Sequence, residues 1–177
     1  RAWSETRLGQ YENALADLQS ITATVWSSQV GPEAYMLSTF VSLKICAYKD
    51  VVKKITAFKK KMLPRVDSLQ DLMAKPLPQD FWNLSDSVKN GKITMALLGS
   101  EAEKYPRYFF RDKQLISDLK AGRKEKVQSR MKLLAEQDLN EIELNLKKMK
   151  IIDVEVIQKV LLADEKKKKK KSDLNFA

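Results

Sequence analysis

The chemistry open to this chain is limited by the residue types that it lacks. Its 177 residues include no histidine and one cysteine, Cys46. Histidine is the commonest general base near neutral pH, and a lone cysteine forms neither an intrachain disulfide nor a cysteine-rich zinc site. We therefore expect no metal site and no cofactor, and we expect Cys46 to be a small, buried apolar residue.

The remaining candidates for catalysis do not match the patterns that catalysis needs. The segment NGKITM (Asn90–Met95) contains Gly-Lys-x-Thr. A phosphate-binding P-loop needs an earlier glycine and a hydroxyl residue directly after the lysine, so this segment instead indicates a turn into a helix. Acidic residues alternate with lysines at the spacing of helix-surface ion pairs, and no two carboxylates stand out as an acid and a base. The sequence therefore predicts a protein that is not an enzyme and has no catalytic residues.

Two basic segments could bind a polyanion. EKYPRYFFR (Glu103–Arg111) interleaves cations with aromatic rings, a mixture that can hold phosphates and stack bases. Its rings fit helix packing equally well. The second segment supplies six of the ten net positive charges and consists of Lys166, Lys167, Lys168, Lys169, Lys170 and Lys171. Like charges in a row repel one another and are typical of a solvated helix end. Binding of nucleic acid or of an anionic membrane surface is therefore our second hypothesis for function.

The elements that position these residues are predicted to be helices. Five glycines and five prolines interrupt the chain, and its many Lys, Glu, Leu and Ala residues favour helix. Nowhere do about 18 uncharged apolar residues follow one another, as a membrane-spanning helix requires. Apolar residues recur at helical spacing in four early segments: a helix end at Trp3–Leu8, a helix over Tyr11–Ser27, one that opens at Pro32, and one that ends before Pro64.

The first two of these segments resemble a tetratricopeptide repeat (TPR). The family's turn glycine, aromatic, alanine and apolar positions are matched by Gly9, Tyr11, Ala14, Leu15, Leu18 and Ile21. The next two helices form an equivalent unit, with Tyr48 lying 37 residues after Tyr11, and a recurrence in the thirties is typical of an α-solenoid. This second unit departs from the pattern, because Cys46 replaces the turn glycine and Val51 the close-packing alanine.

The resemblance implies a fold and a binding surface. TPR arrays stack helical hairpins, and the first helix of each hairpin lines a concave groove that receives a peptide or helix of a partner. It also implies that further repeats, of the same or another chain, precede Arg1. On this sequence the groove maps to Trp3, Thr6, Arg7, Met36, Phe40, Leu43 and Lys44. The alternative for Trp3 and Phe40 is packing in the core.

A narrower resemblance concerns the cell compartment. The segment PEAYMLSTFVSLKICAYKDVVKKITAF is similar to divergent arrays in large bacterial envelope TPR proteins, including those of gliding and predatory species. It implies a place in the bacterial periplasm or envelope. The residues themselves leave the cytoplasm equally open.

Beyond Pro64 the repeat fades. Short helices are predicted over Val66–Lys75, Phe81–Val88 and Ile93–Leu98, followed by a helix that begins after Pro106 and closes at Gly122.

Residues 123–162 contain no glycine or proline and predict one helix of about 40 residues, roughly 60 Å long. Asp138 alone interrupts its apolar stripe, whose mean step of about 3.67 residues indicates a straight helix lying on a surface. The stripe comprises Val127, Met131, Leu134, Ile142, Leu146, Met149, Ile152, Val156 and Val160 around that aspartate. A second stripe is expected to widen the apolar face and comprises Leu133, Leu144, Ile151, Ile157 and Leu161. The β-branched segment from Ile151 to Ile157 could instead break the helix or form a strand.

The sequence as a whole predicts an all-α chain. Residues 1–65 form TPR-like hairpins at the end of an α-solenoid, 66–122 short helices that continue the array, 123–165 one long amphipathic helix, and 166–177 a lysine-rich tail. The predicted function is a non-catalytic scaffold or adaptor that holds other protein chains, or further repeats of its own chain, in a larger assembly. The long helix either caps the solenoid or is held by another chain.

Overall fold

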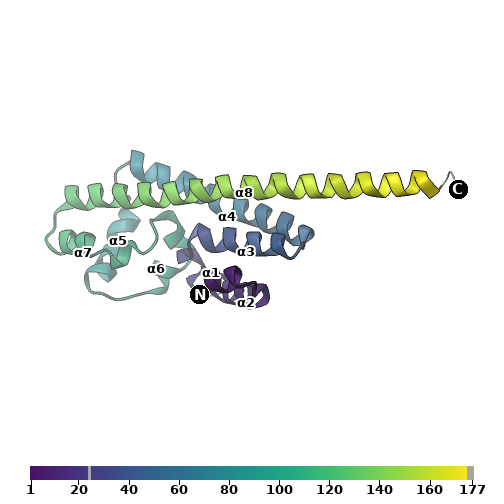
Figure 1. Cartoon of the computed structure of the whole chain (residues 1–177). Helices are drawn as coiled ribbons and strands as arrows, with labels where there is room; N and C mark the ends of the chain where they lie inside the picture. Colours follow the sequence, from purple (N-terminus) through teal and green to yellow (C-terminus); the bar gives the residue numbers. More distant parts are fainter. Residues whose placement is uncertain (24, 175–177) are drawn as a thin grey trace.

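The fold is all-helical, as predicted. The computed structural model describes residues 1–23 and 25–174, with side chains at 1–23, 27–99 and 102–163, and every regular element among them is a helix. Figure 1 shows α8 (Lys124–Leu174) along one side, α3 (Pro32–Lys44) beside it, and α1 (Ala2–Arg7) with α2 (Tyr11–Thr22) on the far side. The hairpins are in contact in chain order, since α2 packs on α3 and α3 packs on both α4 (Tyr48–Ala74) and α8.

The 37-residue recurrence is a recurrence of backbone geometry. Gly9 and Cys46 both adopt the left-handed conformation, with φ of 75° and 59°. In each turn the next residue donates its N–H to the carbonyl five positions earlier, Gln10 to Glu5 at 2.8 Å and Ala47 to Ser42 at 2.9 Å. The expectation that Cys46 is buried is wrong, because this position ends α3 and exposes the thiol to solvent. Assignment to the TPR family stays a prediction.

The second helix ends five residues earlier than predicted. Residues 25–29 form the 3₁₀ segment η1 (Val25–Gln29), and hydrogen bonds join this segment to residues far along the chain. The Ser28 hydroxyl donates to the carbonyl of Leu98, and the Gln29 side-chain carbonyl accepts the N–H of Tyr108 at 2.9 Å. The chain then enters α3 at Pro32, as predicted.

Pro64 does not end a helix, which corrects two predicted elements. The helix expected to stop before Pro64 and the one expected over Val66–Lys75 are a single helix, α4, of 27 residues. Pro64 is exposed, so water can reach the carbonyl of Lys60 that loses its N–H partner. The buried face continues across it unbroken, with steps of three and four residues through Val51, Ile55, Phe58, Met62, Arg65, Leu69 and Leu72.

Short elements gather beside the first half of α8 (Figure 1). They are α5 (Gln79–Lys89), α6 (Met95–Leu98), η2 (Ser100–Lys104), η3 (Phe109–Arg111) and α7 (Lys113–Lys120). The single helix predicted after Pro106 is wrong, because Tyr108 has a φ of 57° and Asp112 caps a new helix by accepting the N–H of Leu115 at 2.8 Å. Gly122 closes α7 with a φ of 68°, as predicted.

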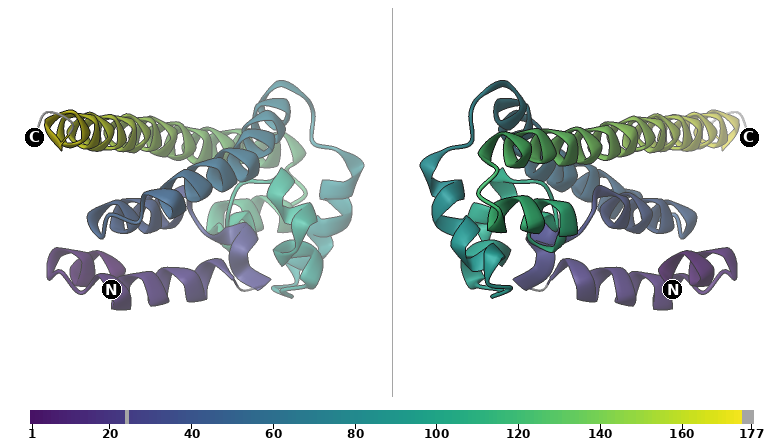
Figure 2. Two further views of the ribbon diagram at one scale, coloured as in Figure 1. Left: turned by 90° about the vertical axis from the view of Figure 1, so that its right-hand side faces the viewer. Right: turned by 90° about the vertical axis from the view of Figure 1, so that its left-hand side faces the viewer.

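The long helix is longer than predicted. α8 has 51 residues, about 77 Å at 1.5 Å per residue, and the β-branched segment after Ile151 is helical. It packs on α3, α4 and α7. Among the residues of α8 up to 163, whose side chains the structure describes, Val156 is the last that is buried. The helix continues from there for about 27 Å to Leu174, and its C-terminal end lies beyond the other helices in Figure 1. Figure 2 shows α8 on the side of the molecule opposite α1 and α2.

A substitution at Pro64 tests the continuity of α4. In Pro64→Ala the N–H of residue 64 can bond to the carbonyl of Lys60, so we expect the free energy of unfolding to rise by about 1–3 kcal/mol in urea denaturation. Pro76→Ala, in the loop after α4, is the control and should bring no such gain. A lower stability for Pro64→Ala would contradict a continuous helix at this residue.

Candidate interaction surface

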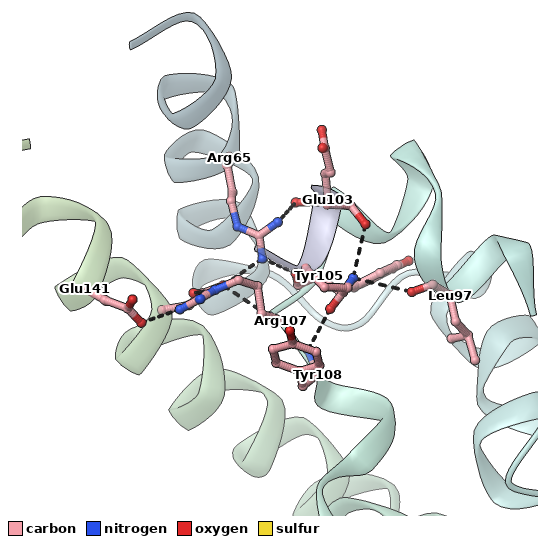
Figure 3. Close-up of polar contacts among 10 residues, drawn as sticks. Arg65, Leu97, Glu103, Tyr105, Arg107, Tyr108 and Glu141 are labelled. Atoms are coloured by element: carbon pink, nitrogen blue, oxygen red, sulfur yellow. Dashed lines mark hydrogen bonds and ion pairs between the residues drawn. The ribbon is translucent and has the colours of Figure 1, made fainter. Parts of the chain in front are cut away.

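A cluster of four charged residues, two of them buried, fixes α8 to the rest of the fold, and Figure 3 labels Arg65, Arg107 and Glu141 of this cluster. Asp138 of α8 accepts the Arg65 guanidinium of α4 at 2.7 Å through one oxygen and the Nε of Arg107 at 2.6 Å through the other. Arg107 also donates to Glu141, one turn further along α8. Asp138 and Arg65 are only 5% and 7% exposed, so these charges are compensated inside the protein rather than by water.

The cluster also gathers the loops around it. Arg65 donates to the carbonyls of Glu103 and Tyr105, at 3.3 Å and 3.0 Å, and the backbone N–H of Arg107 donates to Asp138 at 3.1 Å. Gly31, which precedes α3, lies against the Arg107 guanidinium, and a Cβ at residue 31 would collide with it. We call Arg65, Arg107, Asp138 and Glu141 the anchor cluster, because α3, α4, α8 and the loop at 103–108 all meet there.

The anchor cluster keeps its aspartate ionised. Burial by itself raises the pKa of the Asp138 carboxyl, but attraction to Arg65 and Arg107 and the hydrogen bonds that they donate outweigh it. The pKa of Asp138 therefore lies below its ordinary value. The cluster holds two positive and two negative charges, so its net charge is zero.

The face of α8 that points away from the body carries exposed apolar side chains. Six of them are more than half exposed, and we call them the outer stripe: Leu144, Ile151, Val154, Ile157, Leu161 and Leu162. Leu133, on the same face, is 42% exposed. The predicted second stripe of Leu133, Leu144, Ile151, Ile157 and Leu161 is therefore exposed and does not extend the buried face of α8. The α3 and α4 helices cover one side of α8 only, and these residues lie on the opposite side.

The predicted partner groove is only partly accessible. Thr6, Met36 and Leu43 are buried, so no partner can touch them in this structure, because α1 packs on α2 and α3 packs on α4 and α8. Phe40 is half-buried and packs against both apolar clusters of the fold, as the alternative of packing in the core predicts. Trp3, Arg7 and Lys44 are exposed, but Trp3 donates to Glu33 at 3.2 Å and Lys44 lies over the Phe40 ring. An open cleft does pass Trp3, but it lies between α1, α2 and α3.

The structure describes the side chains of one basic segment but not those of the other. In the segment from Glu103 to Arg111, the rings of Tyr105, Phe109 and Phe110 are buried and cannot stack on bases. Tyr108 is 43% exposed, with Arg111 packed against its ring. The backbone of α8 continues through residues 166–171, but the side chains of Lys166–Lys171 lie outside the described residues.

Comparison with known proteins leaves the family open. No protein-family model, no curated protein and no solved structure matches this chain. Among the described residues, no helix is both long and apolar enough to cross a membrane.

Sequence analysis missed the anchor cluster, although one signal pointed to it. In the sequence, Asp138 stands out only as the residue that interrupts the apolar stripe of the long helix. An acid at a buried helical position needs a cation, and Arg65 stands at the equivalent buried position of α4. The partner could not be chosen from sequence, because 73 residues separate the two and 33 lysines and arginines were available.

Removing the Asp138 charge should destabilise the whole fold. Asp138→Asn leaves the charges of Arg65 and Arg107 buried beside a neutral amide, and we expect a loss of about 3–5 kcal/mol in the free energy of unfolding. Glu136→Gln, two residues earlier and exposed, is the matched control and should change it by less than about 0.5 kcal/mol. Equal effects of the two substitutions would refute the anchoring role.

The same cluster predicts the direction of acid sensitivity. The pKa of Asp138 is lower in the folded chain than its unfolded value of about 3.9, so its contribution is complete above that pH and is lost as the pH falls below it. We expect the free energy of unfolding of the wild-type chain to fall as the pH is lowered from about 5 through the lowered pKa of Asp138. The fall should be shallower in Asp138→Asn, measured by urea denaturation at each pH, and identical slopes would contradict the assignment.

Proposed function

We propose that this chain is a non-catalytic scaffold that binds another protein chain through the outer stripe of α8. The observation that carries the proposal is the exposure of this stripe, from 52% at Leu144 to 69% at Ile151. Contiguous apolar surface of this kind is costly in water and marks interaction sites in folded proteins. The resemblance of residues 7–21 to a TPR, a family of protein-binding scaffolds, agrees with this proposal.

The way α8 is held supports a binding role. Its inner face is fixed by the anchor cluster and by a continuous row of buried residues as far as Val156. A helix fixed in this way presents Leu144, Ile151 and Val154 of the outer stripe already ordered, so α8 would lose little conformational entropy when a partner helix binds there. The surface we propose is thus α8 itself, in place of the concave groove of α1 and α3.

Capture of partners in rising salt tests this proposal against polyanion binding. The wild-type chain and Ile151→Gln/Leu161→Gln are used as baits in native lysate. Glutamine keeps the helix but removes apolar surface. We expect the wild-type chain to hold its partners at 0.5 M salt, a concentration at which ionic contacts are screened, and the double variant to lose them.

Val52→Gln/Leu63→Gln is the matched control, because both residues are 50% exposed but lie on α4. It should capture the same proteins as the wild-type chain. If capture instead disappears at modest salt in all three baits, the lysine-rich end binds a polyanion and the scaffold proposal is wrong.

A further inference from the structure

We infer that the partner of the outer stripe is the outer stripe of a second copy of this chain, in an antiparallel α8–α8 pair. The inference rests on the proposed function, because it names the chain that the stripe binds. It is carried by the order of apolar and charged residues along the exposed side of α8.

The exposed side of α8 has the repeat of a coiled coil. Leu144 and Ile151 lie seven residues apart. Val154 follows Ile151 by three residues, and Leu161 lies seven residues after Val154. Each repeat of seven residues thus holds two seam positions, which is a mean spacing of 3.5 residues and is typical of the seam between two supercoiled helices. The apolar residues of the packed side are spaced by about 3.67 residues. Lys147 and Gln158 are the polar members of this seam.

An antiparallel register pairs like with like along the seam. When Ile151 is opposite Val154 of the second copy, Leu144 is opposite Leu161, so four apolar layers form. The two polar members then meet each other, Lys147 opposite Gln158. In the parallel arrangement every residue meets itself, and Lys147 would face the Lys147 of the second copy, where the two like charges repel.

Charge gives the second argument for this register. Residues 134–139 contain two acids and no base: Glu136 and Asp138. In the same register the six lysines of residues 166–171 on one copy lie level with residues 139–134 of the other. Glu136 is exposed there, whereas Asp138 belongs to the anchor cluster. The parallel arrangement would place six lysines beside six lysines.

The flanks of the seam agree with the antiparallel pair. Lys148 lies opposite Glu155 of the second copy, and by two-fold symmetry Glu155 lies opposite Lys148. Glu155 pairs in the single chain with Lys159 at 3.1 Å, but that contact is nearly half exposed and easily exchanged. The body of each copy packs on the opposite side of its own α8, and Leu133, Glu136 and Asn140 are exposed, so the outer side is open along the register.

Sedimentation equilibrium of the full chain tests the pair. We expect a mass of twice 20.3 kDa at micromolar concentration. Ile151→Lys places a charge in the two central layers and should raise the dissociation constant at least ~100-fold, since two apolar contacts are lost per dimer. Leu63→Lys, at a half-exposed site of α4, should leave the mass dimeric.

Disulfide trapping tests the direction of the two helices. Leu144→Cys and Leu161→Cys are made separately in a Cys46→Ser chain with tags of different mass, and the two are mixed under oxidation. The antiparallel register brings residue 144 of one copy to residue 161 of the other. It keeps the two residues 144 about 26 Å apart, far beyond disulfide reach. We therefore expect disulfides only between the two different variants.

Two results would overturn the inference. Disulfides within each variant alone would show a parallel pair. A wild-type chain that sediments as a monomer would exclude the pair, and the capture experiment would then decide the proposed function separately. If Ile151→Gln/Leu161→Gln still loses a different protein from lysate, the stripe binds that protein, and the proposed function stands without self-association.

Discussion

The fold depends on how the charge of Asp138 is compensated. A carboxylate removed from water at the centre of α8 is tolerable only if cations meet it with good geometry, and Arg65 and Arg107 occupy both of its oxygens. Because Arg65 also holds two loop carbonyls and Arg107 lies against Gly31, one ionised group aligns α4, α8, the start of α3 and the 103–108 loop. Apolar packing alone would let α8 slide along α4 by a turn, whereas these directional bonds fix a single register.

The part of the fold that follows local rules could be predicted from sequence. Turns at Gly9 and Gly122, the helix start at Pro32 and the unbroken helix over residues 124–162 all depend on residues close together in the chain, although α8 continues beyond its predicted end. The prediction that a helix ends at Pro64 was wrong, because the free-energy cost of a proline inside a helix is small beside the gain from burying Phe58, Met62 and Leu69 on both sides of it. The prediction that Cys46 is buried was wrong because cysteine is usually a buried residue type, whereas this one lies at an exposed helix end.

The residues of the candidate surface could be predicted from the sequence, but their exposure to solvent could not. The second apolar stripe of the long helix is visible in the sequence, yet periodicity cannot tell whether a stripe faces the body or the solvent. That depends on which side of α8 the anchor cluster turns inward, and the cluster forms between residues far apart in sequence. The groove assigned through the TPR resemblance fails at Met36 and Leu43 for the same reason, since α3 in this chain is covered on sides that the resemblance leaves open.

The projecting end of α8 has a mechanical consequence. From Val156 onwards the helix is a lever about 27 Å long whose direction is set only where the helix is clamped. A tilt of about 5° at the clamp would displace its far end by roughly 2 Å, which is about half the spacing between neighbouring residues of a chain. A small change in the packing of α3 and α4 is thereby converted into a displacement that another molecule holding the tip could register.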